Sequence, residues 1–477
     1  MSCMNVRVLQ RIFINRNFAL LWVGQIISMA GDNFFDTTLL LWVATQIGRG
    51  QSWTPLGVSA ILLASSLPTV LIGPLAGVFV DRWDKRRTML ASDLIRAVLI
   101  FSLVPLGSLL IENGRLPTLW SLVILCLIAF LDSALTRFFI PSTFVLTGDI
   151  VKKDEQAQAM GMMQLVVRIP MLLGPPLAAI LFFALGAQLA LLFNAFSYLF
   201  SFLLVFLMRP PQSARSLKSG EKGQFFREFT GGFRFFFGNR VLTTVLIASC
   251  LVVLHNGAFS ALGVFFLQQN LHAPLNLYGF LDTALAGGLI LGSAVAAFVV
   301  QRLGLLRVLS VGLLLCGLLA LIYSRLTNFV AALVTLFVLG IIIAGVNIST
   351  GPLVLQSTPK ELTGRVSAIL APSLSLFYSL SLACVGYLDS TIMRNFHQTW
   401  LGVSFGPVDT IFLGAGILAI FGGVFAFVKL RGLALTSESP QQEHIQATAA
   451  GLEEEREQRE IVLAADGEVF EISDNQA

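Results

Sequence analysis

The sequence contains 477 residues, a length at which a soluble protein would hold about three domains of roughly 150 residues each. Its composition excludes that arrangement. With the 41 glycines the apolar share reaches roughly 65%, against about 45–50% in soluble domains, and charged residues make up only 12%. The net charge of +4 hides an asymmetry, because residues 432–477 hold 11 of the 27 acids. Most of the chain is therefore expected to lie in lipid.

Apolar blocks long enough to cross a bilayer core of about 30 Å recur along the chain. Backbone groups in lipid need hydrogen-bond partners within the segment, so each block is expected to be a helix. The expected helices cover residues 18–45, 55–80, 88–111, 118–140, 158–183, 187–207, 241–267, 276–301, 304–324, 328–350, 364–388 and 409–430. The sequence therefore predicts an all-α membrane protein with twelve transmembrane helices.

The basic residues predict the orientation, because cytoplasmic loops of membrane proteins carry an excess of Lys and Arg. With the N-terminus inside, the inner segments hold 22 of the 31 Lys and Arg residues. The outer loops hold only four, which are Arg49, Arg115, Arg325 and Arg394. We therefore expect a multi-pass protein of a bacterial-type cell membrane with both termini in the cytoplasm.

The chain is expected to divide into two bundles of six helices, residues 1–208 and 241–431. A cytoplasmic central loop, residues 209–240, would join them, and an acidic tail, residues 432–477, is expected to be disordered. The halves repeat short patterns in the same order: Asn15-Arg16 before the first helix matches Asn239-Arg240 before the seventh. Parallel repeats of this kind are typical of transporters that hold substrate between the two halves near the midplane.

The sharpest local motif follows the second expected helix and reads Gly73-Pro74-x2-Gly77-x3-Asp81-Arg82-x-Asp84-Lys85-Arg86-Arg87. Glycines at 73 and 77 remove side chains from one helix face, which lets another helix approach closely. The acid and arginine cluster at the inner interface can pair across a tight turn and lock two helices together. The alternative is a positively charged anchor with incidental glycines.

This motif resembles the signature between helices two and three of the major facilitator superfamily. The resemblance extends over about 430 residues, through the twelve spans, the long central loop and the repeated halves. Two further stretches, Trp22-Val23-Gly24-Gln25-x2-Ser28-x2-Gly31-Asp32 and Pro141 with Asp149-Ile150-Val151, look like the drug, macrolide and siderophore exporter branch. The resemblance implies that the motif acts as a conformational latch formed by Gly73, Gly77, Asp81, Arg82, Asp84, Arg86 and Arg87. The resemblance also extends to the fifth expected helix, where Gly174-Pro175-Pro176 is similar to the start of an antiporter motif. The glycines that follow in that motif are absent from this sequence.

Charged residues within spans are costly in lipid, and they indicate function. The first helix carries Gln25, Ser28, Asp32 and Asp36 at spacings of 3, 4 and 4, which places them on one helix face. Asp32 lies about 21 Å along the helix from Phe18, somewhat past the midplane. We expect this face to line a cavity in which the carboxylates bind substrate and protons. The alternative is a structural aspartate bonded to a neighbouring helix.

Other polar residues inside the spans are weaker candidates for the same cavity. Asp132 and Arg137 lie on the fourth helix, where Arg137 could neutralise an acid on helix one or five. On the seventh helix, Asn256 is a candidate, and His255 is either a titrating group or a packed side chain. Asp93 and Arg96, three residues apart on the third helix, are expected to form a structural pair.

Several functions find no support in the sequence. There is no phosphate-binding loop, no nucleophile or zinc-protease motif, and no paired Cys/His set among the five cysteines and four histidines. We expect no enzyme activity, no cofactor, no metal and no nucleic-acid partner, and we expect a monomer.

The favoured function is export of hydrophobic or amphiphilic small molecules, driven by the proton gradient through alternating access. Three alternatives remain open: a lipid or lysolipid flippase of the same fold, a sensor or scaffold that uses the acidic tail, and an importer of a metabolite.

Overall fold

The computed structural model describes residues 14–107, 117–209, 234–359, 362–396, 398–400 and 403–430. Apart from Leu430, these residues belong to the first of two units, Met1–Lys429 and Leu430–Ala477. The proposed acidic tail and most of the central loop therefore lie outside the described residues.

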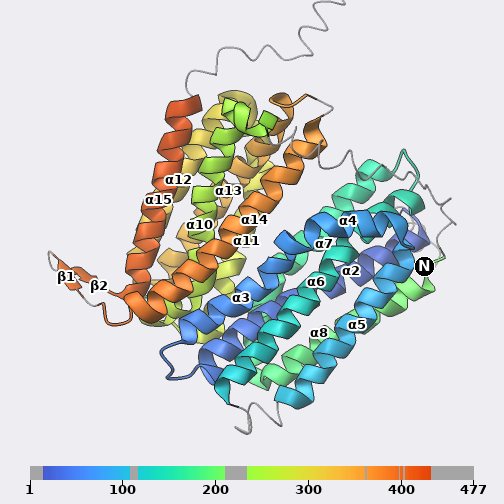
Figure 1. The fold of residues 1–477 in the computed structure, drawn as a ribbon, viewed down its shortest axis with the longest axis horizontal. Helices are drawn as coiled ribbons and strands as arrows, with labels where there is room; N and C mark the ends of the chain where they lie inside the picture. The colour runs from blue at the N-terminus through green and yellow to red at the C-terminus, as the bar shows by residue number, and fades with distance from the viewer. Residues whose placement is uncertain are drawn as a thin grey trace, which may run out of the picture. The chain divides into compact units, whose positions relative to one another are not determined.

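The first bundle comprises the helices up to residue 207, shown from blue to green in Figure 1. Their bounds are α2 Arg16–Trp42, α3 Thr54–Leu71, α4 Gly73–Arg82, α5 Lys85–Leu106, α6 Thr118–Ile150, α7 Gln156–Leu185 and α8 Ala187–Leu207. A π-helical turn, η1 Val43–Ile47, continues α2.

The second bundle comprises the helices from residue 240 onward. Their bounds are α10 Arg240–Gln269, α11 Tyr278–Leu303, α12 Leu305–Ser324, α13 Phe329–Gln356, α14 Thr363–Tyr387 and α15 Pro407–Leu430, with short turns η3 Leu275–Leu277 and η5 Leu388–Ile392. An antiparallel hairpin, β1 Gln398–Trp400 and β2 Val403–Phe405, precedes α15.

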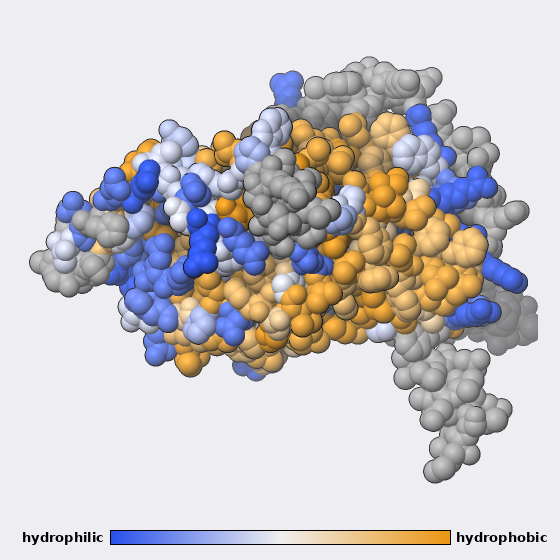
Figure 2. All heavy atoms as spheres, turned by 90° about the horizontal axis from the view of Figure 1, so that it is seen from below, coloured by the Kyte–Doolittle hydropathy of each residue, from blue (hydrophilic) through white to orange (hydrophobic). Residues whose placement is uncertain are grey.

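The prediction of an all-α membrane protein with twelve spans is confirmed, since the described part of the chain has 12 helices long and apolar enough to cross a membrane. Figure 2 shows the consequence, a broad apolar surface with hydrophilic residues toward its left and right ends. Apolar side chains face outward here because lipid, unlike water, does not penalise their exposure.

Prolines and glycines shape three helices differently from the prediction. The second expected helix is broken at Ile72, just before Gly73-Pro74, into α3 and α4. Conversely, Pro141 and Pro352 lie inside α6 and α13, which continue well past the expected ends at residues 140 and 350. Membrane helices tolerate proline because neighbouring helices and local adjustments satisfy the freed backbone groups.

The two bundles use the same device where each begins. Asn15 caps α2 by accepting a hydrogen bond from the Phe18 amide, and its side-chain amide donates to the Ile150 carbonyl at the end of α6. Asn239 caps α10 in the same way and donates to the Ser357 carbonyl just after α13. The repeat seen in the sequence is therefore a structural repeat, in which an asparagine ties the first helix of each half to the end of the fourth.

Glycine allows α2 to pack tightly in the middle of the first bundle. A side chain at Gly31 would collide with Ser197 and Asn194 on α8, and one at Gly174 on α7 would meet Asn33. Close approach of helix backbones is the usual role of small residues in membrane interfaces. α2 is therefore held between α7 and α8.

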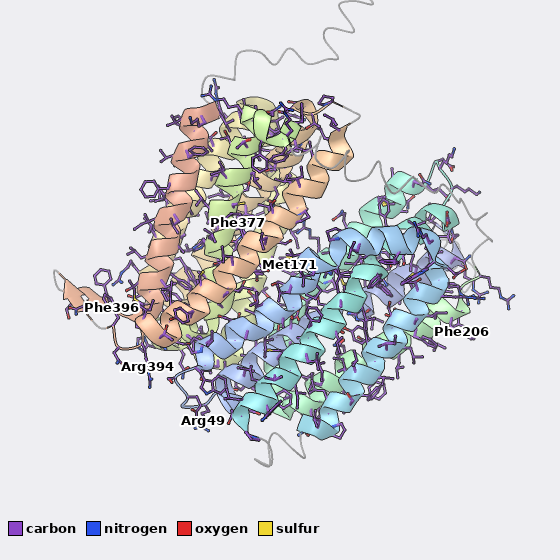
Figure 3. The ribbon with its side chains drawn as sticks, in the orientation of Figure 1. Arg49, Met171, Phe206, Phe377, Arg394 and Phe396 are labelled. Atoms are coloured by element: carbon purple, nitrogen blue, oxygen red, sulfur yellow. The ribbon has the colours of Figure 1, made fainter. Side chains whose placement is uncertain are left out.

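Hydrogen bonds join the two bundles from their predicted outer ends to about the middle of the helices. The Leu56 amide on α3 donates to the Ser390 hydroxyl at 2.9 Å, and the Ser66 and Ser379 hydroxyls are 2.8 Å apart. Thr283 on α11 donates to the Leu172 carbonyl on α7 at 2.8 Å. In Figure 3, Arg49 and Arg394 mark this end, and Phe206 lies at the opposite end of the first bundle.

One glycine shows how closely the bundles approach. Gly279 on α11 has no room for a side chain, because it lies directly against the backbone of Pro175. The bundles are thus in tight contact toward the predicted outer end.

Candidate functional site

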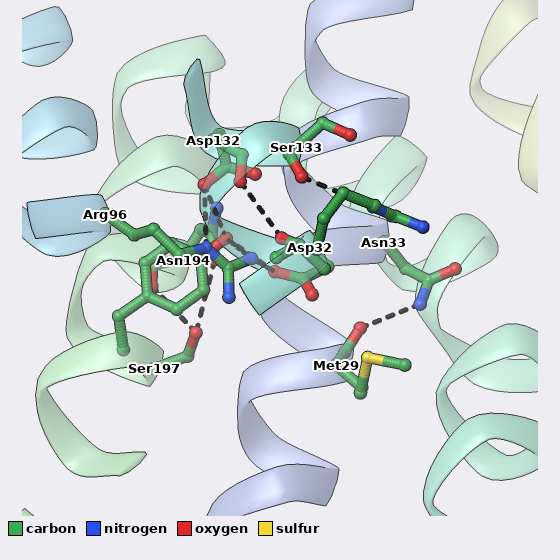
Figure 4. Close-up of polar contacts among 11 residues, drawn as sticks. Met29, Asp32, Asn33, Arg96, Asp132, Ser133, Asn194 and Ser197 are labelled. Carbon is green, nitrogen blue, oxygen red and sulfur yellow. Dashed lines mark hydrogen bonds and ion pairs between the residues drawn. The ribbon is translucent and has the colours of Figure 1, made fainter. Parts of the chain in front are cut away.

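A buried arginine joins three other helices in the middle of the first bundle. The Arg96 guanidinium on α5 lies 2.7 Å from Asp32 on α2, measured from Nη2 to Oδ1, and its Nε lies 3.1 Å from Asp132 Oδ1 on α6. Tyr198 on α8 accepts from Arg96 at 2.6 Å, and its ring lies 4.0 Å beneath the guanidinium carbon. We call Asp32, Arg96, Asp132 and Tyr198 the Arg96 cluster (Figure 4).

The Tyr198 hydroxyl also contacts both carboxylates. It lies 2.5 Å from Asp32 Oδ1 and 3.0 Å from Asp132 Oδ1, so its single proton is donated to one of them at a time. The Oδ1 atom of each carboxylate therefore has two polar partners. Buried charges persist in a protein only when they are paired and hydrogen-bonded in this way.

The cluster does not balance its own charge. One guanidinium faces two carboxylates, so the cluster carries a net charge of −1 when both acids are ionised. Arg96, Asp132 and Tyr198 are buried, whereas the Asp32 side chain keeps 19% of its surface exposed. Water competes poorly for a buried charge, and an unbalanced one is costly. Binding of one proton would neutralise the cluster.

Asp36 lies one helical turn beyond Asp32 and has no ion-pair partner among the described residues. It and Arg16 are the exposed residues of α2, whose other side chains are at least half-buried. Asp36 is therefore an exposed carboxylate next to the Arg96 cluster on α2.

The predicted face of helix one is thus divided between two environments. Gln25 and Ser28 are buried by the packing of the first bundle and are not exposed as Asp36 is. Asp32 is engaged by Arg96, and Asp36 alone of the four is exposed. Helical spacing placed the four residues on one side of α2, but the neighbouring helices cover half of that side.

Arg137 does not neutralise an acid through an ion pair in the described structure. Its Nε donates to the Ser133 carbonyl of its own helix at 3.4 Å, and the residue is half-buried. The residue that pairs with Asp32 and Asp132 is Arg96. The expected ion pair of Arg96 with Asp93, three residues away on the same helix, is not among the described ion pairs. Arg96 and Tyr198 are the site residues that sequence reasoning missed.

The second bundle contributes no residue to the Arg96 cluster. His255 is buried, and its ring lies 6.5 Å from that of Phe412, centroid to centroid. Asn256 is half-buried on the same helix. No described hydrogen bond or ion pair links either residue to Asp32 or Asp132. Their assignment to a substrate cavity stays a prediction.

The loop motif is partly described. Asp84 caps α5 by accepting from the Arg87 amide at 2.8 Å, and Arg86 donates to the Val205 and Phe206 carbonyls at 3.2 and 2.5 Å. Arg86 therefore fastens the start of α5 to the end of α8, and Arg82 and Arg87 are exposed.

Three residues of the predicted latch do not support it in the described structure: Gly73 differs from the prediction, and Asp81 and Gly77 are not described. The open space around Gly73 does not fit the expected close helix approach there. The side chain of Asp81 and the surroundings of Gly77 lie outside what the structure describes. The latch role itself stays a prediction.

Within the described residues, no group of three or more His, Cys, Asp or Glu side chains could hold a metal ion. The Arg96 cluster brings together two carboxylates, a phenol and a guanidinium, and carboxylates are groups that can take up and release protons.

Comparison with known proteins finds similar membrane transporters. The chain is 25% identical over 433 residues to the MFS-type transporter YkuC of Bacillus subtilis. The aligned region covers 88% of this chain and 93% of YkuC. It is 24% identical over 280 residues to macrolide efflux protein A of Streptococcus pyogenes. The aligned region covers 58% of this chain and 66% of that protein.

Among solved structures, the chain resembles a bacterial homologue of the human lysosomal transporter Spinster in an inward-facing, unoccupied conformation. The TM-score is 0.65 at 14% identity, over 89% of this chain and 99% of the other. The sequence model of the Major Facilitator Superfamily matches residues 21–375 and 250–464. Twelve membrane helices in two repeated bundles, together with this match, establish that the chain belongs to the major facilitator superfamily.

Proposed function

We propose that this transporter exports hydrophobic or amphiphilic small molecules of the macrolide type, and that inward movement of protons drives the export. In this proposal it is a monomer in a bacterial cell membrane with both termini in the cytoplasm. The observation that carries the proposal is the Arg96 cluster, in which two carboxylates compete for one buried guanidinium.

The charge imbalance explains how a proton would be coupled to movement. With both acids ionised, the cluster holds an excess negative charge in a region of low dielectric constant, which favours uptake of a proton. Asp32 is the acid to receive it, since its side chain is the more exposed of the two carboxylates (19% against 10%). A protonated Asp32 would release Arg96 to pair with Asp132 alone.

Asp36 would connect this exchange to the substrate. It is exposed one turn from Asp32 on the same helix. A substrate that enters between the bundles would meet this carboxylate, and its binding would change the field at Asp32. Exchange of proton and substrate at neighbouring carboxylates supports antiport.

The contacts between the bundles support a state open to the cytoplasm. The hydrogen bonds from α3 to α14 and from α7 to α11 lie between the predicted outer end and about the middle of the helices. Gly174-Pro175-Pro176 lies where α7 meets both α2 and α11. A substrate would therefore be taken up from the cytoplasm, as export requires.

The substrate class rests on two observations. The spans are rich in phenylalanine, which suits apolar substrates, and a similar protein is macrolide efflux protein A.

The test of the proposed function is uptake of erythromycin or a hydrophobic dye into everted vesicles, with and without a pH gradient. We expect gradient-driven uptake by the wild type, and at least a tenfold smaller gradient-dependent part for Asp32→Asn.

Asp282→Asn is the matched control, because Asp282 is a carboxylate within a span of the second bundle that makes no described ion pair. It should keep the ratio of driven to undriven uptake. Full gradient-dependent uptake by Asp32→Asn would show that the coupling role of Asp32 is wrong. Transfer of labelled lysolipid by the wild type without a gradient, in place of drug uptake, would favour the flippase function.

A further inference from the structure

A pocket at the predicted inner end of the first bundle plays no part in the proposed transport cycle. Its volume is about 440 Å³. It is lined by Asn15, Arg16, Asn17, Ile150, Leu207 and Arg209, which come from the start of α2, the end of α6 and the end of α8.

The side chains of the two asparagines in the pocket already make hydrogen bonds within the protein. Asn15 caps α2 and donates to the Ile150 carbonyl at 2.8 Å. Asn17 donates to the Arg209 carbonyl at 3.0 Å and accepts from the Arg209 amide at 3.1 Å. These bonds fix the backbone of residue 209 beside the start of α2, and they leave its side chain unconstrained.

The two arginines of the pocket are not neutralised within the described chain. Arg16 and Arg209 are exposed, and neither guanidinium makes a hydrogen bond or an ion pair with the described residues. Asp149, the acid next to Ile150 in sequence, pairs with neither of them. Arg86, by contrast, is committed to the Val205 and Phe206 carbonyls. As far as the described residues go, the pocket therefore offers an anion two positive charges without an acidic partner.

The apolar surface next to the pocket indicates what kind of anion fits. Leu203, Phe206 and Leu207 on α8 are all exposed, and they form an apolar strip that ends at Arg209. In Figure 2, hydrophilic residues border the apolar surface at the right-hand edge, the end where Figure 3 labels Phe206. A ligand that bears a phosphate and hydrocarbon chains would contact both parts, whereas a free phosphate would contact only the arginines.

We propose that Arg16 and Arg209 bind the phosphate of an anionic phospholipid such as phosphatidylglycerol, whose acyl chains lie along α8. Arginine suits this task because its planar guanidinium binds phosphate oxygens in pairs. A basic residue near a membrane surface contributes attraction worth about a fivefold change in lipid affinity. The lipid would link α2 to α8, the two helices that carry Asp32 and Tyr198.

The test is native mass spectrometry of the full-length purified protein in detergent with equal amounts of phosphatidylglycerol and phosphatidylcholine. We expect the wild type to retain phosphatidylglycerol preferentially. Arg16→Ala and Arg209→Ala should each lower its retention about fivefold, and the double variant more. The Asn17 bonds to the backbone of residue 209 survive Arg209→Ala, so a folding defect is not expected, and Arg209→Lys should restore much of the retention.

Arg240→Ala is the matched control, since Arg240 follows the capping Asn239 as Arg16 follows Asn15 and is likewise exposed. It should retain phosphatidylglycerol as the wild type does. Equal retention of the two lipids by the wild type would overturn the proposal, and so would an Arg240→Ala loss as large as that of Arg16→Ala. Inorganic phosphate that displaces the lipid at millimolar concentration would assign the pocket to a soluble anion instead.

Discussion

The two bundles repeat one architecture but place different chemistry at its centre. The first bundle buries the Arg96 cluster, with its two carboxylates and one guanidinium. The second buries a group of aromatic rings, in which Phe266 and Tyr323 are 4.8 Å apart and Phe266 and Phe412 are 5.1 Å apart between centroids. Among its described residues, the ion pair of the second bundle is Arg325 with Asp409, at its predicted outer end.

This difference indicates a division of labour between the repeats. An ionic centre can change its charge when a proton binds, whereas an aromatic centre responds to pH only through its neighbours. Asn256 stands at the position of the second repeat that corresponds to Asp32, at the same offset as Asn239 from Asn15. The first bundle is therefore the proposed site of proton exchange, and the centre of the second is mainly aromatic and apolar.

The largest expected effect comes from removing the shared cation with Arg96→Met. Two carboxylates would then face each other without a counter-charge, and loss of one partner of a buried pair costs about 3–5 kcal/mol. The loss should be smaller at low pH, because protonation of Asp32 or Asp132 relieves the repulsion. Thermal unfolding in detergent between pH 5 and 8 measures both effects.

Phe412→Ala is the counterpart in the second bundle. Removal of this buried ring should cost a similar 3–5 kcal/mol by leaving a cavity, without dependence on pH. If the loss caused by Arg96→Met were equally insensitive to pH, the ionic description of the first bundle would be wrong.

The next effect in size concerns two buried tyrosines, one in each bundle. Tyr198→Phe removes a hydroxyl that contacts Asp32, Asp132 and Arg96, at a cost of about 0.5–1.5 kcal/mol per hydrogen bond. The hydroxyl of Tyr323 has no hydrogen-bond partner in the described structure, so Tyr323→Phe should be neutral or slightly stabilising. Unfolding midpoints of the two variants make the comparison, and equal losses would contradict it.

The helices could be predicted from sequence because lipid demands long apolar segments. The break at Ile72 and the continuation through Pro141 could not, since a membrane helix tolerates proline where its surroundings satisfy the freed backbone groups, and the sequence does not show those surroundings. Asp32 and Asp132 stood out as acids within spans. Arg96, the residue that pairs with both acids, did not stand out as their partner. It lies three residues from Asp93 on the same helix, and a sequence shows spacing within a helix but not contacts between helices.

Tyr198 illustrates the remaining limit of sequence reasoning. It is one aromatic residue in an apolar helix, and nothing in its neighbourhood along the chain distinguishes it from a packing residue. Its role follows only from the position of α8 beside α2 and α5, which depends on small residues such as Gly31.

The smallest expected effect is that of His255→Gln. His255 is buried beside Phe412 and has no described contact with the Arg96 cluster, so the pH dependence of transport should be unchanged. Gradient-driven dye uptake between pH 6 and 8 tests this. A shifted pH profile would move part of the proton exchange into the second bundle.

Proton release on substrate binding measures the central claim most directly. Purified transporter in weakly buffered detergent, with a pH-sensitive dye, should release protons when erythromycin is added to the wild type and to Asp282→Asn. Asp32→Asn should bind erythromycin and release none. Release by Asp32→Asn equal to that of the wild type would contradict proton exchange at the Arg96 cluster.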